Sequence, residues 1–227
     1  MVRLDVNVLG GRCTKRSMDL VLGGLMILLA LVPLVLAAVA IKLEDGGRVF
    51  FRQQRIGRGG RRFRVLKLRT MSVMREAPSG PDRLHRGDAR ITRVGAVLRK
   101  LGIDELPQLF NVMGGTMSLV GPRPTLGFQV AEYNSFQRRR LEAKAGITSL
   151  AVVSGRNALP WDERIKLDIW YIDHWSLGLD VSILFRTLWK VLVTREGLYA
   201  SEGFNDGFVS ASRDGRDESN GPRGLER

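Results

Sequence analysis

Two adjacent carboxylates, Asp104 and Glu105, are the residues of this sequence best suited to chemistry. They stand among basic side chains and directly before a helical pattern of apolar residues. An aspartate can act as a covalent nucleophile, and Mg²⁺ is typically bound by one or two carboxylates together with the phosphates of a substrate. The pair therefore predicts a phosphate site that uses Mg²⁺, with Asp104 and Glu105 as its catalytic and metal-binding residues.

A structural role explains the same two residues. Asp104 would be the N-cap of the following helix, and Glu105 an acidic residue of its first turn, where Pro107 is tolerated. From the local sequence alone, this capping role is the simpler interpretation. The two roles are compatible, because the N-terminus of a helix also attracts anions.

Four basic residues are candidates for binding a phosphate near this pair. Lys67 and Arg69 end a predicted strand and, being two residues apart, are expected to share one face. Arg123 lies in a rigid Gly-Pro-Arg-Pro turn at 121–124. Arg99 ends the helix upstream of the pair, where a cation also complements the helix dipole.

The composition indicates an anionic partner. The chain of 227 residues is long enough for one main domain with a core, and it carries a net charge of +13. A membrane surface or a phosphorylated substrate fits that charge. Nucleic acid fits it too, but no recognisable reading motif is present, so we expect no nucleic-acid partner. A single cysteine, Cys13, excludes an intrachain disulfide, and only two histidines, His85 and His174, argue against a Cys/His zinc site.

An uncharged segment at residues 20–41 is long enough to cross a bilayer. Three interpretations compete: a cleaved signal peptide, a straight membrane anchor, and a re-entrant helix that bends at Pro33 and returns to the face it entered. Basic residues flank both ends of the segment, and the positive-inside rule places both flanks in the cytoplasm. The charge pattern therefore favours the re-entrant helix, with Pro33 as the membrane break.

The rest of the pattern predicts an α+β domain. A basic β-hairpin is expected over 48–69, with glycines at its turn and with arginines that face solvent or anionic lipid. The arginine run at 138–140 is interpreted as a solvated face. A strand is expected at 150–153, after a turn at 145–148. Helices are expected at 91–101, 106–113, 125–145, 162–175 and 179–193, the last two being amphipathic.

The order of these motifs resembles the small monotopic bacterial phosphoglycosyl transferases, which contain the bacterial sugar transferase domain. The resemblance spans about residues 12–204. Each motif is weak alone, but their order over such a length is specific. The motifs are Lys-Arg-Ser-Met-Asp at 15–19, Lys-Leu-Arg-Thr-Met at 67–71, Asp-Ala-Arg-Ile-Thr-Arg-Val-Gly at 88–95, Asp-Glu-Leu-Pro-Gln-Leu-Phe-Asn at 104–111, and Gly-Pro-Arg-Pro at 121–124.

The resemblance implies a monotopic protein at the cytoplasmic face of the bacterial inner membrane. It implies transfer of a sugar phosphate from a UDP-sugar to undecaprenyl phosphate, with release of UMP, through a covalent phosphosugar intermediate. This is the first membrane step of glycan assembly. The expected organisation is an N-terminal tail at 1–12, a re-entrant membrane helix at 13–47, a cytoplasmic catalytic domain at 48–205 and a disordered tail at 206–227.

The same resemblance gives the candidate residues their roles. Asp104 matches the nucleophile, and Glu105 matches the partner carboxylate that works with Mg²⁺. Arg99 and Arg123 match phosphate-binding positions, and Lys67 matches the basic residue of the strand motif. The implied partners are the UDP-sugar, undecaprenyl phosphate and anionic membrane lipids, and a homodimer is allowed.

The sequence departs from the family pattern at three places. Val32 precedes Pro33, where the family has serine, and the segments 145–149 and 152–155 differ from the family's donor-side motifs. The stretch 155–161 resembles the branch that acts on N-acetylated deoxy-amino sugars, which makes Arg156 a further substrate-binding candidate. One alternative of a different class is a non-catalytic membrane-surface adaptor that binds anionic lipid; its activity would not depend on Asp104.

Overall fold

The computed structural model describes residues 6–72, 90–155 and 159–192. Helices and short strands are interleaved along the chain, which confirms the predicted α+β class. The elements are α1 (Val6–Asp45), β1 (Phe50–Ile56), η1 (Arg58–Gly60), β2 (Arg62–Leu68), α2 (Arg93–Leu101), η2 (Ile103–Glu105), α3 (Gln108–Met113), β3 (Met117–Val120), α4 (Gly127–Ala131), α5 (Ser135–Arg138), η3 (Arg139–Glu142), β4 (Ala145–Thr148), α6 (Leu150–Ser154), α7 (Trp161–Asp173) and α8 (Leu177–Leu192).

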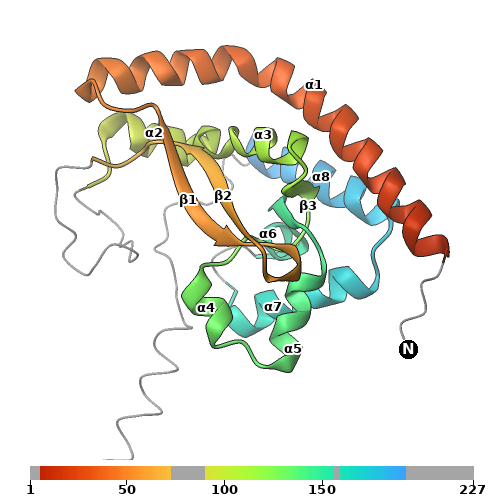
Figure 1. The fold of residues 1–227 in the computed structure, drawn as a ribbon. Helices are drawn as coiled ribbons and strands as arrows, with labels where there is room; N and C mark the ends of the chain where they lie inside the picture. The colour runs from red at the N-terminus through yellow and green to blue at the C-terminus, as the bar shows by residue number, and fades with distance from the viewer. Residues whose placement is uncertain (1–5, 73–89, 156–158, 193–227) are drawn as a thin grey trace, which may run out of the picture.

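Helix α1 is the longest element and curves over the rest of the molecule (Figure 1). Its segment Cys13–Asp45 is long and apolar enough to cross a membrane, by length and composition. The helix begins at Val6, so part of the expected N-terminal tail is helical. It also continues through Pro33, so the expected break does not interrupt the helix. A proline removes one helical hydrogen bond, and the turns on either side of it can still form.

The two sides of α1 have different environments. The inner side packs on α2, α3 and β3, where Asp19, Ala30, Ala37 and Ile41 are buried. Contacts with the domain therefore extend along most of the helix. The opposite side exposes large apolar side chains, a surface of the kind that lipid covers. These residues include Val21, Leu28, Leu29, Val32, Leu36 and Leu43.

Strands β1 and β2 form the predicted antiparallel hairpin, in a register that pairs Phe50 with Leu68. Val65 points into the core, while Arg64 on the same strand is exposed. Glycines at the turn permit the tight reversal around η1, where Gly59 and Gly60 have positive φ angles. In Figure 1 the hairpin lies beside β3, and β2 packs against α3. The hairpin thus places the end of β2 beside the start of α3.

The second sheet differs from the expectation. The segment Ala145–Thr148, expected as a turn, is strand β4, and it pairs in parallel with β3, a strand that the sequence analysis missed. The segment expected as a strand at 150–153 is instead helix α6, which Ser149 caps by accepting a hydrogen bond from Val152 N. Four consecutive buried apolar residues have no periodicity, so such a run does not distinguish a strand from a buried helix.

The other predicted helices are present. Helices α2, α7 and α8 lie close to the expected ranges, and the helical stretch at 125–145 is divided into α4, α5 and η3. One main hydrophobic cluster joins the membrane helix to the domain. Its fully buried members include Val65, Leu109, Val112, Met117, Leu119, Val120 and Ile183, with Ala30 of α1 among them.

Candidate active site

The carboxylate pair lies in the short turn η2, between α2 and α3. Helix α2 ends at Gly102, whose φ of 70° is the left-handed conformation that closes many helices. The chain then reverses into η2, and Asp104 is the central residue of that turn. Neither η2 nor α3 has a side-chain cap in this described stretch. The interpretation of Asp104 as an N-cap is therefore wrong.

Glu105 is the anionic centre of the site. Its side chain is 3 % exposed, and its Oε1 accepts hydrogen bonds from Lys67 Nζ at 2.5 Å and from Arg123 Nη2 at 3.3 Å. Lys67 comes from β2, and Arg123 comes from the turn after β3. Three segments that are far apart in the sequence therefore meet at one carboxylate oxygen, which brings Lys67 and Arg123 to the carboxylate pair.

The two carboxylates have different charge environments. Burial and the neighbouring charge of Glu105 raise the pKa of Asp104 to about 6, against the opposing effects of Lys67, Arg99 and Arg123. Burial also disfavours the charged form of Glu105, but the two cations bonded to it outweigh this and hold its pKa below the usual range. Such a separation of pKa values in one pair is typical of carboxylates with different roles. Glu105 is the anion that Lys67 and Arg123 fix in place.

Asp104 is the more accessible of the two. It is half-buried, whereas Glu105 is buried. Among the described residues, no hydrogen bond to the Asp104 carboxylate is found, although the positive charges of Lys67, Arg99 and Arg123 act on it. Asp104 can therefore approach a substrate without first breaking an ion pair.

The other predicted basic residues have separate positions. Arg99 donates from Nε to Thr70 Oγ1 at 2.8 Å and is close enough to lower the pKa of Asp104. Arg69 is not brought to the pair. Its guanidinium binds Asp45 at the end of α1, and its Nε donates to Arg48 O at 2.6 Å.

Arg69 reaches a different partner from Lys67. Its backbone N–H still bonds β1, at Val49 O, but its guanidinium binds Asp45 and not the carboxylate pair. Arg69 ties the membrane helix to the hairpin instead. Arg156 lies outside the described residues.

The pair fits a magnesium ion. Within the described ranges, no group of three or more His, Cys, Asp and Glu side chains is placed to hold a metal by itself. Two carboxylates suffice for Mg²⁺ when substrate phosphates complete the coordination. Oε2 of Glu105 is buried and has no hydrogen-bond partner among these residues. That oxygen is therefore available to a cation.

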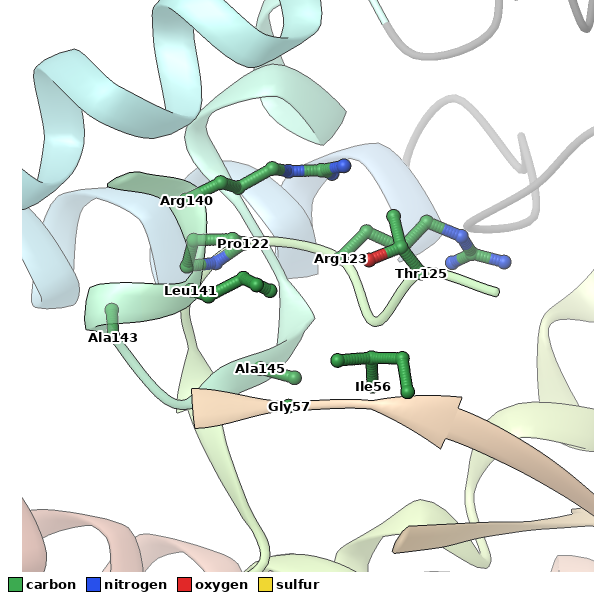
Figure 2. Close-up of a pocket in the computed structure, with 9 residues that line it drawn as sticks. All are labelled: Ile56, Gly57, Pro122, Arg123, Thr125, Arg140, Leu141, Ala143 and Ala145. Atoms are coloured by element: carbon green, nitrogen blue, oxygen red, sulfur yellow. The ribbon is translucent and has the colours of Figure 1, made fainter. Parts of the chain in front are cut away.

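A second buried arginine lies near Arg123. Arg140 lines a small cavity of about 10 Å³ together with Arg123 and Thr125, and in Figure 2 the two arginine side chains extend in the same direction. The cavity has room for about one water molecule. This cavity is too small for a nucleotide or a sugar.

Arg140 corrects the interpretation of the arginine run at 138–140. Its side chain is 4 % exposed, and its Nε donates to Asp168 Oδ2 at 2.6 Å. It also donates to Tyr133 Oη at 2.9 Å and stacks over Trp161. Only a solvated face was expected here, because a run of like charges gives no sign of which member turns inward.

Sequence reasoning also missed how the membrane helix docks. Arg16 donates to Val112 O at 2.6 Å and to Met113 O at 2.7 Å, at the C-terminal end of α3. Asp19 is buried and accepts from Leu119 N at 3.0 Å, on strand β3. The Lys-Arg-Ser-Met-Asp motif was the only available signal, and a motif by itself does not name the atoms it contacts.

The comparisons with known proteins agree with this geometry. The family model described as "Bacterial sugar transferase" matches residues 10–194. The chain belongs to the bacterial sugar transferase family. It is 42 % identical to "Uncharacterized sugar transferase EpsL" of Bacillus subtilis, over 81 % of this chain and 89 % of that protein.

Two further relatives of this family member have more specific names. One is "UDP-glucose:undecaprenyl-phosphate glucose-1-phosphate transferase" of Caulobacter vibrioides, 44 % identical over 79 % of this chain and 70 % of the relative. The other is "Undecaprenyl-phosphate galactose phosphotransferase" of Salmonella typhimurium, 40 % identical over 83 % of this chain. The match spans 42 % of the Salmonella protein, so that relative contains a large region without a counterpart here.

Proposed function

We propose that this bacterial sugar transferase is a phosphoglycosyl transferase. It moves a sugar phosphate from a UDP-sugar to undecaprenyl phosphate, giving undecaprenyl-diphosphate-sugar and UMP. The names of the Caulobacter and Salmonella relatives support this reaction class. The observation that carries the proposal is the unequal carboxylate pair. Glu105 is held by Lys67 and Arg123, while the Asp104 carboxylate beside it is accessible.

The proposed reaction has two displacements at one phosphorus atom. An oxygen of the Asp104 carboxylate attacks the phosphorus that carries the sugar, the bond to the bridging oxygen breaks, and UMP leaves. A phosphate oxygen of undecaprenyl phosphate then attacks the same phosphorus and releases the Asp104 carboxylate. Such displacements depend mainly on positioning and on neutralising phosphate charge.

The chain's own residues supply most of that neutralisation. Lys67 and Arg123 converge on Glu105, and 20 % and 25 % of their side chains remain exposed. Arg99 adds a third positive charge near Asp104. Mg²⁺, bound by Asp104 and Glu105, would neutralise charge on the diphosphate of the donor.

Two donor classes have separate support. The relatives named for galactose and glucose favour a UDP-hexose. The resemblance of residues 155–161 favours an N-acetylated deoxy-amino sugar, and Arg156 in that stretch lies outside the described residues. We propose the UDP-hexose class first, and the deoxy-amino sugar stays a prediction.

The test of the reaction is UMP release by the purified protein in nanodiscs with undecaprenyl phosphate and Mg²⁺. The donor panel contains UDP-glucose, UDP-galactose and UDP-linked N-acetylated deoxy-amino sugars. Release with one donor, dependent on undecaprenyl phosphate over repeated turnovers, would support the proposal. No release with any donor of the panel would contradict it.

We propose a monotopic arrangement on the cytoplasmic face of the bacterial inner membrane. Both ends of α1 are held by the same domain: Arg16 binds the end of α3, and Asp45 binds Arg69. A helix that packs lengthwise on a domain in water does not cross the bilayer as a straight anchor. Its exposed apolar side would enter the membrane from one face, and exposed hairpin arginines such as Arg64 would contact anionic lipid.

This arrangement predicts that both chain ends lie on one side of the membrane. Single cysteines at positions 3 and 205, introduced into a Cys13→Ser background, are expected to resist an impermeant maleimide in intact cells. Both are expected to react after the cells are opened. Labelling of only one of the two positions in intact cells would mean that α1 spans the membrane.

Arg69 gives a prediction that separates anchoring from catalysis. Because Arg69 binds Asp45 and not the carboxylate pair, Arg69→Gln is expected to keep kcat for UMP release within about threefold of wild type. Arg123→Gln is expected to lower kcat by about 100-fold, because it removes a charge at the reacting phosphate. Steady-state kinetics of both variants check this. Equal losses would restore Arg69 to the phosphate site.

A further inference from the structure

Asn111 joins the helix after the carboxylate pair to the strand that carries Lys67. Its Oδ1 accepts a hydrogen bond from Leu66 N at 2.9 Å, and its Nδ2 donates to Arg64 O at 2.8 Å. The partners fix the orientation of the amide, because a backbone N–H only donates and a carbonyl only accepts. The Asn111 amide thus forms the same two kinds of hydrogen bond with β2 that a neighbouring strand would form, one from a backbone N–H and one to a backbone C=O.

The contacted edge of β2 has no other strand. Within the described chain, β2 pairs with β1 alone, in a two-stranded sheet. Just beyond the strand's end, the backbone N–H of Arg69 donates to Val49 O on the β1 side. In an antiparallel ladder, successive residues point their backbone N–H and C=O groups alternately toward and away from the partner strand. The backbone groups of residues 64 and 66 therefore point away from β1. Asn111 satisfies two backbone groups on this free edge, Leu66 N and Arg64 O.

The same two segments also meet at the active site. Leu66 is adjacent to Lys67, whose Nζ lies 2.5 Å from Glu105 Oε1. Glu105 and Asn111 belong to one continuous run of helical turns, in which Leu106 N bonds Ile103 O and Leu109 N bonds Leu106 O. The segment 103–113 therefore touches β2 at two places, through an ion pair and through an amide.

The far end of this segment is already fixed. Arg16 of α1 holds the last carbonyls of α3. The contact with Arg16 does not fix the position of α3 along β2. The Asn111 side chain does fix it, because it bonds two backbone groups of that strand. A shift of α3 along β2 would separate Glu105 from Lys67.

We infer that Asn111 is a positioning residue, which sets the alignment of the Asp104–Glu105 segment on the strand that carries Lys67. The inference rests on the proposed function for its effect on turnover. Its effect on the environment of Lys67 is independent of turnover. Asn111 itself is not expected to touch the substrate.

The first test measures the accessibility of Lys67. Asn111→Leu removes both hydrogen bonds at similar size, and Asn111→Asp keeps the acceptor but loses the donor. Acetylation of Lys67 by an amine-reactive reagent, followed by mass spectrometry, is expected to be at least about threefold faster in Asn111→Leu, with Asn111→Asp intermediate. An unchanged rate in both variants would overturn the inference, whether or not the protein proves to be a transferase.

A matched control separates alignment from general destabilisation. Asn134 caps α5 by accepting from Gln137 N at 2.9 Å, on another part of the domain. Asn134→Ala is expected to lower the thermal midpoint without changing Lys67 acetylation. If Asn134→Ala accelerates that acetylation as much as Asn111→Leu does, the effect is loss of stability, and the inference fails.

The second test is kinetic. With an active wild type, Asn111→Leu is expected to lower kcat by about 10- to 100-fold while KM for the donor changes by less than about threefold. Asn111→Leu and Lys67→Met are expected to be non-additive, because both remove the same ion pair. Additive losses, or an unchanged kcat in Asn111→Leu, would overturn the inference. An inactive wild type would instead contradict the proposed function.

Discussion

Asp104→Asn is expected to abolish UMP release, with a loss on the order of 1,000-fold or more. An asparagine is the same size as aspartate but cannot form the phosphosugar bond. Membrane association and the fold are expected to persist, because the hydrogen bonds of Arg16 and Asp19 that dock α1 do not involve Asp104. Steady-state UMP release and vesicle flotation check both expectations. Retained activity above a few per cent would contradict the covalent mechanism, and an unchanged cellular phenotype would favour the lipid-binding adaptor.

The same substitution is expected to stabilise the protein. The folded state raises the pKa of Asp104 from 3.8 to about 6, mainly through burial and the charge of Glu105. A carboxyl with a raised pKa favours folding below its unfolded pKa, and that contribution is lost as the pH rises through about 6. Asparagine does not ionise, so Asp104→Asn is expected to unfold with a free energy about 1–3 kcal/mol higher than wild type at pH 8.

Denaturant unfolding in detergent with EDTA measures this difference. The gap between Asp104→Asn and wild type is expected to be small at pH 4 and to open between pH 4 and pH 7. Asp162→Asn, at an exposed aspartate of α7, is the control for removing a carboxylate elsewhere in the domain. A constant gap across this range would mean that Asp104 does not titrate as described.

Glu105→Gln is expected to have the opposite effect on stability. Glu105 is the shared partner of Lys67 and Arg123, so its neutral replacement leaves two cations without their anion. Removing one partner of a fully buried pair costs about 3–5 kcal/mol. The two cations keep 20 % and 25 % exposure, so we expect a loss of about 2–3 kcal/mol here.

The rate of UMP release is expected to fall in Glu105→Gln as well. Glu105→Gln should lower kcat by about 100-fold or more, because Lys67 and Arg123 lose their fixed position and a metal-binding oxygen is replaced. Glu163→Gln, at an exposed glutamate paired with Lys166, is the control and should change neither quantity. Equal stability losses in the two variants would contradict the role of Glu105 as the fixed anion.

The elements that the sequence predicts well have strong local signals. The hairpin has alternation and turn glycines, and α2, α7 and α8 have helical periodicity. Strand β3 and helix α6 are four and five residues long, and all their residues but Ser154 are buried, so neither had a period to detect. The resemblance to a family supplied the role of Asp104 where local rules favoured a helix cap.

The parts of the site that escaped prediction depend on tertiary contacts. Lys67, Glu105 and Arg123 meet only because β2, η2 and the turn after β3 converge. In the sequence Arg69 is equivalent to Lys67, and only its contact with Asp45 at the end of α1 distinguishes the two. The backbone partners of Asn111 are likewise set by how α3 packs on β2, which no spacing in the sequence encodes.

One measurement tests the central claim most directly. The protein is mixed with Mg²⁺ and its UDP-sugar donor without undecaprenyl phosphate, and its intact mass and the UMP released are recorded. The account predicts an adduct with the mass of the sugar phosphate, about one UMP per adduct formed, and no adduct in Asp104→Asn. Donor turnover that requires undecaprenyl phosphate from the start, with no adduct at any time, would contradict a nucleophilic Asp104.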